Sequence, residues 1–170
     1  MKCLFKYLIF TLLFNIGTTF AQDKEYSING WVNAGIGISY AKIYESGIGV
    51  NINGSITIDK VVATLRYSGG GEILGSGYDE FGLLAGYIFK MKDSHALISG
   101  GFAEATLYES KGLFSKGTEK KLRSFIGEFQ YCYNIWNFLG VGFILHCNLN
   151  NSLNAFGINL NLFLGSLNLE

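Results

Sequence analysis

The sequence lacks proline, has few cysteines and carries no excess of either charge. Its 170 residues include no proline, three cysteines, and 13 basic and 13 acidic side chains. The charge balance removes any electrostatic case for binding nucleic acid, and the few cysteines place little constraint on the fold. The absence of proline suits long strands, because every backbone N–H is then available for a sheet. Glycine is abundant instead, since its 23 residues are roughly twice the ordinary usage.

A long apolar run is also lacking after residue 22. The apolar segment at 8–16 follows two lysines and is too short for a membrane-spanning helix, which needs ~20 residues. Thr19 and Ala21 are small residues at the positions that signal peptidase recognises. We therefore expect a signal peptide at 1–21 and a single domain at 22–170. The alternative is a retained N-terminal anchor.

The most regular feature of the remaining chain is a strict alternation of apolar and polar residues. It extends through 28–40 and 48–58, and such a period of two predicts β-strands. The polar face carries Asn, Gly, Ser and Thr rather than the Lys and Glu that cover a soluble sheet, whereas the apolar face is unbroken. This pattern indicates strands whose apolar side meets lipid and whose small polar side packs inside a narrow barrel. The alternative is a soluble periplasmic lipocalin-like barrel, which inverts the faces and binds an apolar ligand among inward-facing Ile, Val and Leu.

We expect an all-β fold: an eight-stranded, antiparallel, up-and-down transmembrane β-barrel with both termini on the periplasmic side. Short turns should alternate with longer loops, as in outer-membrane barrels, whose turns are periplasmic and whose loops lie outside. The longer loops are expected at 69–80 and 109–121, with modest links at 41–47 and 150–154. The predicted strands are 28–40, 48–58, 61–69, 81–90, 95–108, 122–133, 138–149 and 155–167.

The register of neighbouring strands follows from which residues belong to the apolar face. A two-residue turn should pair Ile58 with Val61, and an even turn should place Phe89 and Ala96 on the same face. The sixth and seventh strands require an odd connection, so we expect a three-residue loop at 135–137.

Charged residues are nearly absent from the predicted strands. Arg66, Lys90 and Glu128 are the main exceptions, and all three lie on the inner face. A charge on the lipid face at mid-depth costs roughly 2–4 kcal/mol, so this placement supports the barrel. We expect Arg66 and Glu128 to form an ion pair that plugs the lumen, with Gln130 beside it; the alternative is a gate for a narrow proton or ion path. Further side chains that should fill the lumen are Trp31, Leu84, Ile126 and Phe163.

Two cysteines, Cys132 and Cys147, remain after the signal peptide. They are predicted on neighbouring strands but on opposite faces and several residues apart, and a disulfide needs Cα atoms within about 7 Å. We expect two free thiols.

The loop at 109–121 contains the densest group of cations. Lys111, Lys116, Lys120 and Lys121 lie there, where they would meet the phosphates of lipopolysaccharide or a surface protein partner. The alternative is a plain solvated loop. The sequence has no metal-ligand spacing of His, Cys, Asp or Glu, and we expect neither a metal nor a cofactor.

The pattern of the whole mature chain resembles the small OmpA/OmpX-like outer-membrane β-barrel proteins of Gram-negative bacteria. The runs at 138–142 and 157–165, rich in Gly, Asn and Leu, resemble small barrels of the Bacteroidetes type, many of which have no assigned activity. The resemblance implies an outer-membrane location, contact with outer-membrane lipid and lipopolysaccharide, and a monomeric, non-enzymatic protein. The chain departs from the family at its end, where Leu169 and Glu170 stand in place of an aromatic residue.

His146 is the one candidate for chemistry. His146-Cys147-Asn148 and Gly157-Ile158-Asn159 resemble the His-x-Ser and Gly-Ile-Glu segments of barrel-embedded lipid A deacylases of the PagL type. In that comparison Asn148 stands in place of the nucleophile and Asn159 in place of the orienting carboxylate, and neither amide performs that role. The alternative is a lumen histidine that hydrogen-bonds neighbouring asparagines.

Overall fold

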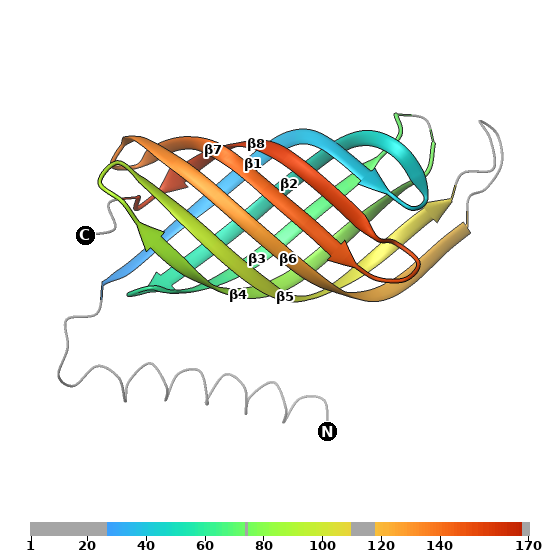
Figure 1. The fold of residues 1–170 in the computed structure, drawn as a ribbon, viewed down its shortest axis with the longest axis horizontal. Coiled ribbons are helices and arrows are strands. Elements are labelled where there is room, and N and C mark those ends of the chain that lie inside the picture. Colours follow the sequence, from blue (N-terminus) through green and yellow to red (C-terminus); the bar gives the residue numbers. More distant parts are fainter. Residues whose placement is uncertain (1–26, 74, 110–117, 168–170) are drawn as a thin grey trace, which may run out of the picture.

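The chain forms one closed β-barrel in the computed structural model, which describes residues 27–73, 75–109 and 118–167 (Figure 1). Each strand pairs with its neighbours in the sequence, and β1 pairs with β8 to close the sheet. This confirms the predicted eight-stranded, antiparallel, up-and-down architecture, while the predicted signal peptide at 1–21 lies outside the described residues. The strands are β1 (Ile28–Ala41), β2 (Tyr44–Ile58), β3 (Val61–Gly71), β4 (Gly77–Lys90), β5 (Ser94–Glu109), β6 (Thr118–Trp136), β7 (Leu139–Leu149) and β8 (Ala155–Gly165).

The two faces of the barrel wall have opposite chemistry. Ile52 and Leu160 are 59% and 72% exposed on the outside, whereas the adjacent Asn51 and Asn161 are buried inside. The lipocalin-like alternative is therefore wrong, because it required the isoleucines in the middle. Among the described residues, no helix is long and apolar enough to cross a membrane.

The predicted register is confirmed at two turns. Ile58 pairs directly with Val61, and Phe89 pairs with Ala96. Since a shift of one residue would exchange the two faces of a strand, these pairs keep the apolar set of β2 to β5 on the outside.

The connection between β6 and β7 differs from the predicted three-residue loop at 135–137. A bulge at Ile135 shifts the register, and the tight turn lies at 137–138. The bulge supplies the odd residue that the alternation requires, because Tyr133 still pairs with Val141 and their side chains stay on the outer face.

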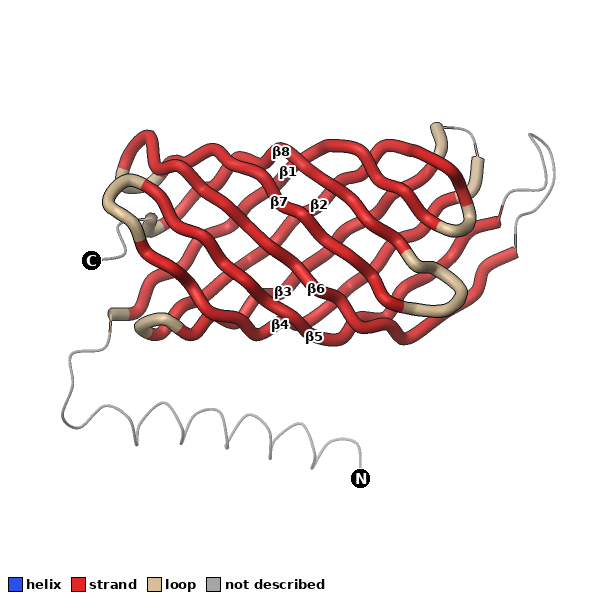
Figure 2. The backbone as a smooth tube through the Cα atoms, in the orientation of Figure 1, coloured by secondary structure: helices blue, strands red, loops and turns tan. Residues whose placement is uncertain are grey.

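The connections differ between the two ends of the barrel (Figure 2). The turn end carries the short links at 59–60, 91–93 and 137–138, together with the start of β1 and the end of β8. The loop end carries the links at 42–43, 72–76, 110–117 and 150–154.

Two links at the loop end are shorter than predicted, because the strands extend through glycine-rich segments. The expected link at 41–47 is reduced to 42–43, and the loop at 69–80 is reduced to 72–76. Gly71 pairs with Gly77, and a Cβ on Gly71 would lie 2.8 Å from the Gly77 Cα atom. The missing side chains let the two strands approach closely enough to continue the ladder, so glycine here lengthens the strands instead of ending them.

The last strand ends earlier than the predicted residue 167. Gly165 has a φ of 143°, and a Cβ there would lie 2.6 Å from the Trp31 Cα atom, so a residue with a side chain would be strained at this position. After Gly165 the chain turns over the barrel mouth, and the side chain of Leu167 becomes fully buried.

Strands β4, β5 and β6 extend beyond the barrel at the loop end (Figure 1). β6 pairs with β5 from Thr118 onward but with β7 only from Phe125 onward. The segment at 118–124 therefore forms an edge that is paired on one side and stands above the rim.

The lipid-facing character of the outer wall leads to a first prediction. Leu160→Arg, at the middle of β8, should lower the free energy of unfolding in phospholipid vesicles by roughly 2–4 kcal/mol, because it places a charge at mid-depth. Urea titration in vesicles measures this change. The matched control is Ile73→Arg, because Ile73 is 82% exposed in the link between β3 and β4. Equal stability of the two variants would contradict a lipid-facing wall.

Candidate functional site

The centre of the lumen holds one guanidinium between two carboxylates. Arg66 on β3 is fully buried; its Nη1 pairs with Glu80 of β4, and its Nε lies 2.8 Å from Oε2 of Glu128 on β6. The ion pair expected between Arg66 and Glu128 is thus present. Glu80 was missed, because the fourth strand was predicted to begin at Phe81. Its even position, in register with the inward-facing Leu84, was the available signal.

Neutral side chains satisfy the remaining oxygens of the two carboxylates. Gln130 Nε2 donates to Glu128 Oε1 at 2.6 Å, and Asn53 Nδ2 donates to the same oxygen at 3.2 Å. Asn148 Nδ2 donates to Glu80 Oε2, and the Ser68 hydroxyl donates to Oε1 at 3.1 Å. A charge removed from water must be paired and hydrogen-bonded, and this arrangement supplies both requirements.

A second polar group joins the strands where the barrel closes. Asn51 of β2 donates to Asn161 Oδ1 at 2.8 Å and to Asn33 Oδ1 at 3.2 Å. Asn159 of β8 donates to Asn51 Oδ1 at 2.8 Å. These amides therefore link β1, β2 and β8 from the inside.

Aromatic and apolar side chains close the lumen toward the loop end. Tyr44 and Tyr78 are stacked with ring centroids 6.3 Å apart, and the hydroxyls of Ser39 and Tyr44 share a hydrogen bond of 2.8 Å. We call this group, with its buried neighbours, the outer plug. Its apolar members are Ala41, Tyr44, Tyr78, Ala105, Leu107, Leu153 and Ala155.

A second group, the inner plug, closes the lumen toward the turn end. Leu167 seals it from below, and the Asn134 side chain donates to the main-chain oxygen of Leu167 at 3.0 Å. His95, which sequence reasoning missed, packs between Trp31 and Phe163 with centroid distances of 5.3 and 6.2 Å. The members of the inner plug are Trp31, Val62, Ile88, Leu97, Cys132, Ile144, Phe163 and Leu167. Leu84 and Ile126, the other predicted space-fillers, are also buried, in a third cluster with Ala103.

His146 lies in the lumen just below the outer plug. Its Nε2 is 3.5 Å from the Tyr78 hydroxyl, and its ring packs over Gly157, where no side chain intervenes. The expectation that neighbouring asparagines hydrogen-bond His146 is wrong, because Asn148 and Asn159 are directed to Glu80 and Asn51 instead.

The structure does not assemble the hydrolase-like arrangement around His146. Asn148 also donates to Ser124 at 2.8 Å, so this position is committed to the polar network. Ser152, the nearest serine in the following link, receives a hydrogen bond from Lys120 Nζ at 3.4 Å. Among the described side chains, no group of three His, Cys, Asp or Glu residues is placed to hold a metal ion.

The cysteines and the remaining inner cation lie apart from this network. Cys132 is buried in the inner plug, whereas Cys147 is on the outer face, and both are free thiols as predicted. Lys90 is half-buried at the turn end of β4.

The predicted cationic loop is described only in part. Lys120 and Lys121 are exposed at the start of β6, and Lys121 Nζ lies 3.5 Å from Oε1 of Glu104. Lys111 and Lys116 lie outside the described residues. Lys42 donates to the main-chain oxygen of Asn151 at 3.1 Å, on the other side of the same end.

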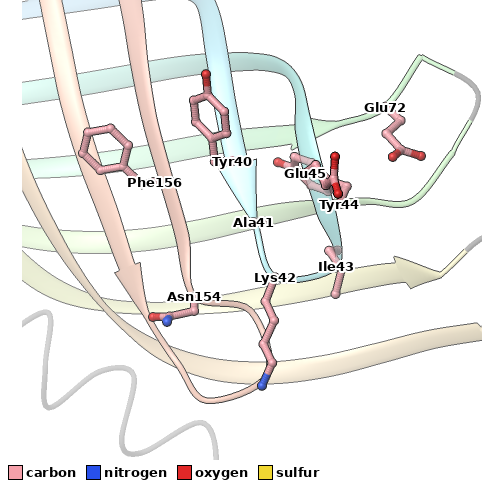
Figure 3. A pocket seen from close by; sticks show the side chains of 9 residues that line it. All are labelled: Tyr40, Ala41, Lys42, Ile43, Tyr44, Glu45, Glu72, Asn154 and Phe156. Carbon is pink, nitrogen blue, oxygen red and sulfur yellow. The ribbon is translucent and has the colours of Figure 1, made fainter.

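A groove crosses the loop end between β1, β2 and β8 (Figure 3). Tyr40 and Phe156 are paired on the wall, whereas Lys42 extends away from them. Glu45 and Glu72 line the opposite part of the groove. The groove therefore combines an aromatic wall with a rim of mixed charge.

Comparison with known proteins gives a likeness of fold. No protein-family model and no curated protein matches the sequence. Among solved structures, Neisserial surface protein A has a TM-score of 0.63 at 9% identity, over 83% of this chain and 99% of that one. The N-terminal β-barrel of Pseudomonas aeruginosa OprF has a TM-score of 0.60 at 14% identity, over 81% and 97%. Ail of Yersinia pestis, in complex with the heparin analogue sucrose octasulfate, has a TM-score of 0.62 at 10% identity, over 82% and 99%. The chain thus shares the fold of small outer-membrane barrels.

The central ion cluster leads to a second prediction. Arg66→Met should lower the free energy of unfolding by about 3–5 kcal/mol, because it leaves two buried carboxylates without a counter-charge. Urea unfolding in vesicles, followed by tryptophan fluorescence, measures the loss. Adding Glu80→Gln and Glu128→Gln to Arg66→Met should recover most of it.

The matched control removes a cation from the rim. Lys121→Met breaks an ion pair whose side chains are 74% and 62% exposed, so it should cost at most about 1 kcal/mol. If Arg66→Met were as stable as Lys121→Met, the two carboxylates would not depend on the guanidinium.

Proposed function

We propose that the chain is exported with cleavage after Ala21, inserts into the outer membrane of a Gram-negative bacterium, and acts there without enzymatic activity. Its role is structural or depends on contacts made by the loop end, and it is a monomer. The closing sequence places it with the small Bacteroidetes-type barrels that it resembles. The fold shared with outer-membrane barrels and the apolar outer wall support this location.

The sealed lumen is the observation on which the proposal depends. Tyr44, Tyr78 and Leu153 fill the loop end of the lumen, and Trp31 and Leu167 fill the turn end. Between these plugs Arg66 is held by two carboxylates. Since eight strands leave an interior only wide enough for side chains, the barrel has neither a water-filled channel nor a ligand chamber. The surfaces left for function are the lipid-facing wall and the rim.

Two features of the loop end support a role in surface contact. The β4–β5–β6 extension stands above the rim, and its edge at 118–124 carries Lys120 and Lys121. Anionic partners fit such a surface, and Lys111 and Lys116 belong to the same loop. One structural neighbour, Ail, was solved with a sulfated sugar, which is a polyanion of the same chemical class.

The hydrolase alternative has little support. His146 is buried beneath the outer plug, and its side-chain partner is Tyr78 rather than a serine. Incubation of the reconstituted protein with lipid A should release no fatty acid. Release that disappears in His146→Ala would contradict the non-enzymatic proposal.

The proposed function is tested in cells that express the full chain. The protein should stay in the outer-membrane fraction after a carbonate wash, and the unboiled protein should migrate differently from the boiled one. Binding of heparin to whole cells should fall several-fold when Lys111, Lys116, Lys120 and Lys121 are all changed to Gln, because each removed charge weakens attraction to a polyanion.

The control for this experiment changes two exposed lysines at the turn end, Lys60→Gln and Lys92→Gln, which should leave heparin binding unchanged. Release by carbonate would contradict the location. Equal binding by the rim variant and the control would contradict a role of the rim cations.

A further inference from the structure

The outer wall of β5, β6 and β7 contains an open groove of about 640 Å³ near the loop end. Phe102 is 76% exposed, and Phe125 and Leu149 are also exposed, so the groove presents an apolar surface to the outside. Arg123 lines the same groove on the side of the loops. The lining residues are Phe102, Ala103, Arg123, Ser124, Phe125 and Leu149.

The shape of the groove follows from the sequence of the two strands. Phe102 pairs with Phe125, and one pair nearer the turn end of the outer face is Gly100 with Gly127. A Cβ on Gly100 would lie 3.2 Å from Cζ of Phe125, so the Phe125 ring leans over the glycine. The rings of Phe102 and Phe125 meet edge to face, with centroids 5.7 Å apart and an interplanar angle of 80°. Two packed rings beside two glycines create a defined apolar depression in the wall.

A positive charge lies at the loop side of this depression. Arg123 is two residues from Phe125 on the same outer face, and its pairing partner on β5 is Glu104. Glu104 forms its ion pair with Lys121, and Arg123 forms none with any described side chain. The three side chains together carry one net positive charge. The Asn150 side chain donates to the main-chain oxygen of Arg123 at 2.6 Å, which holds the backbone there against the link between β7 and β8.

From this juxtaposition we propose that the groove binds a single acylated lipid with a phosphate headgroup, as carried by the outer leaflet. The inference rests on the proposed location of the barrel. The Arg123 guanidinium and Lys121 contact the phosphate, and an acyl chain lies along Phe102, Phe125 and Leu149. Arginine suits this role, because its planar fork donates two parallel hydrogen bonds to a phosphate.

The order of chemistry along the wall matches such a lipid. Cations lie toward the loops and apolar side chains lie toward the middle of the wall, in the same sequence as headgroup and chain. The groove beside Tyr40 lacks this complementarity, since Glu45 and Glu72 would repel a phosphate. The charges therefore favour the β5–β7 groove as the lipid site.

The test measures lipids that remain bound when the folded full chain is released from dodecyl maltoside micelles in a native mass spectrometer. Diphosphoryl lipid A is the phosphorylated probe and phosphatidylcholine is the zwitterionic comparison. The wild type should retain lipid A, and Arg123→Gln should reduce the retained fraction about tenfold. Phe102→Ala combined with Leu149→Ala should reduce it several-fold.

Two matched controls separate the groove from general effects. Lys60→Gln removes an exposed cation at the turn end, and Ile52→Ala removes a lipid-facing side chain from β2; neither should change retention. Migration of unboiled samples confirms that each variant is folded. Because Arg123→Gln leaves carbonate resistance intact, failure of the lipid site is distinguishable from failure of the proposed location.

Several results would overturn the proposal. Equal loss in Arg123→Gln and Lys60→Gln would mean general electrostatic attraction, and equal retention of phosphatidylcholine would mean no selection of phosphate. Displacement of lipid A by an equal concentration of inorganic phosphate would mean that the apolar groove contributes nothing. Unchanged retention in the Phe102 and Leu149 variant would have the same meaning.

Discussion

The burial of one guanidinium between two carboxylates is the constraint on which the interior depends. Arg66, Glu80 and Glu128 come from β3, β4 and β6, so their pairing requires that these strands face one another across a closed sheet. Amides complete the hydrogen bonding of the cluster, and a second amide group ties β1, β2 and β8 at the seam. The polar interior is therefore a structural element, and it is compatible with an outer wall that has no charge at mid-depth.

The two plugs decide what the barrel can do. A lumen filled by stacked tyrosines at one end and by Trp31, Phe163 and Leu167 at the other leaves no path between the two sides of a membrane. Interaction is then confined to the outside of the molecule. The loop end combines an extended three-stranded edge, exposed lysines and two grooves of different charge, which makes it the most varied surface of the described chain.

Much of the fold was predictable, because a period of two with one unbroken apolar face fixes both the type of element and its orientation. The pairs Ile58–Val61 and Phe89–Ala96 followed from that alternation alone. The site was less predictable, because its members depend on where strands end. Glu80 lies just before a predicted strand, and Leu167 reaches the lumen only because the chain turns at Gly165. His95 could not be recognised, since no pattern in the sequence shows that Trp31 and Phe163 meet it from across the barrel.

The orientation of the side chains is the central claim, and nuclear magnetic resonance in deuterated-lipid nanodiscs doped with protonated acyl chains tests it most directly. Methyl groups of Ile52 and Leu160 should show cross-relaxation to the acyl chains, whereas the side-chain amides of Asn51 and Asn161 should show none. Acyl-chain contacts to these amides, without contacts to the methyl groups, would contradict the account.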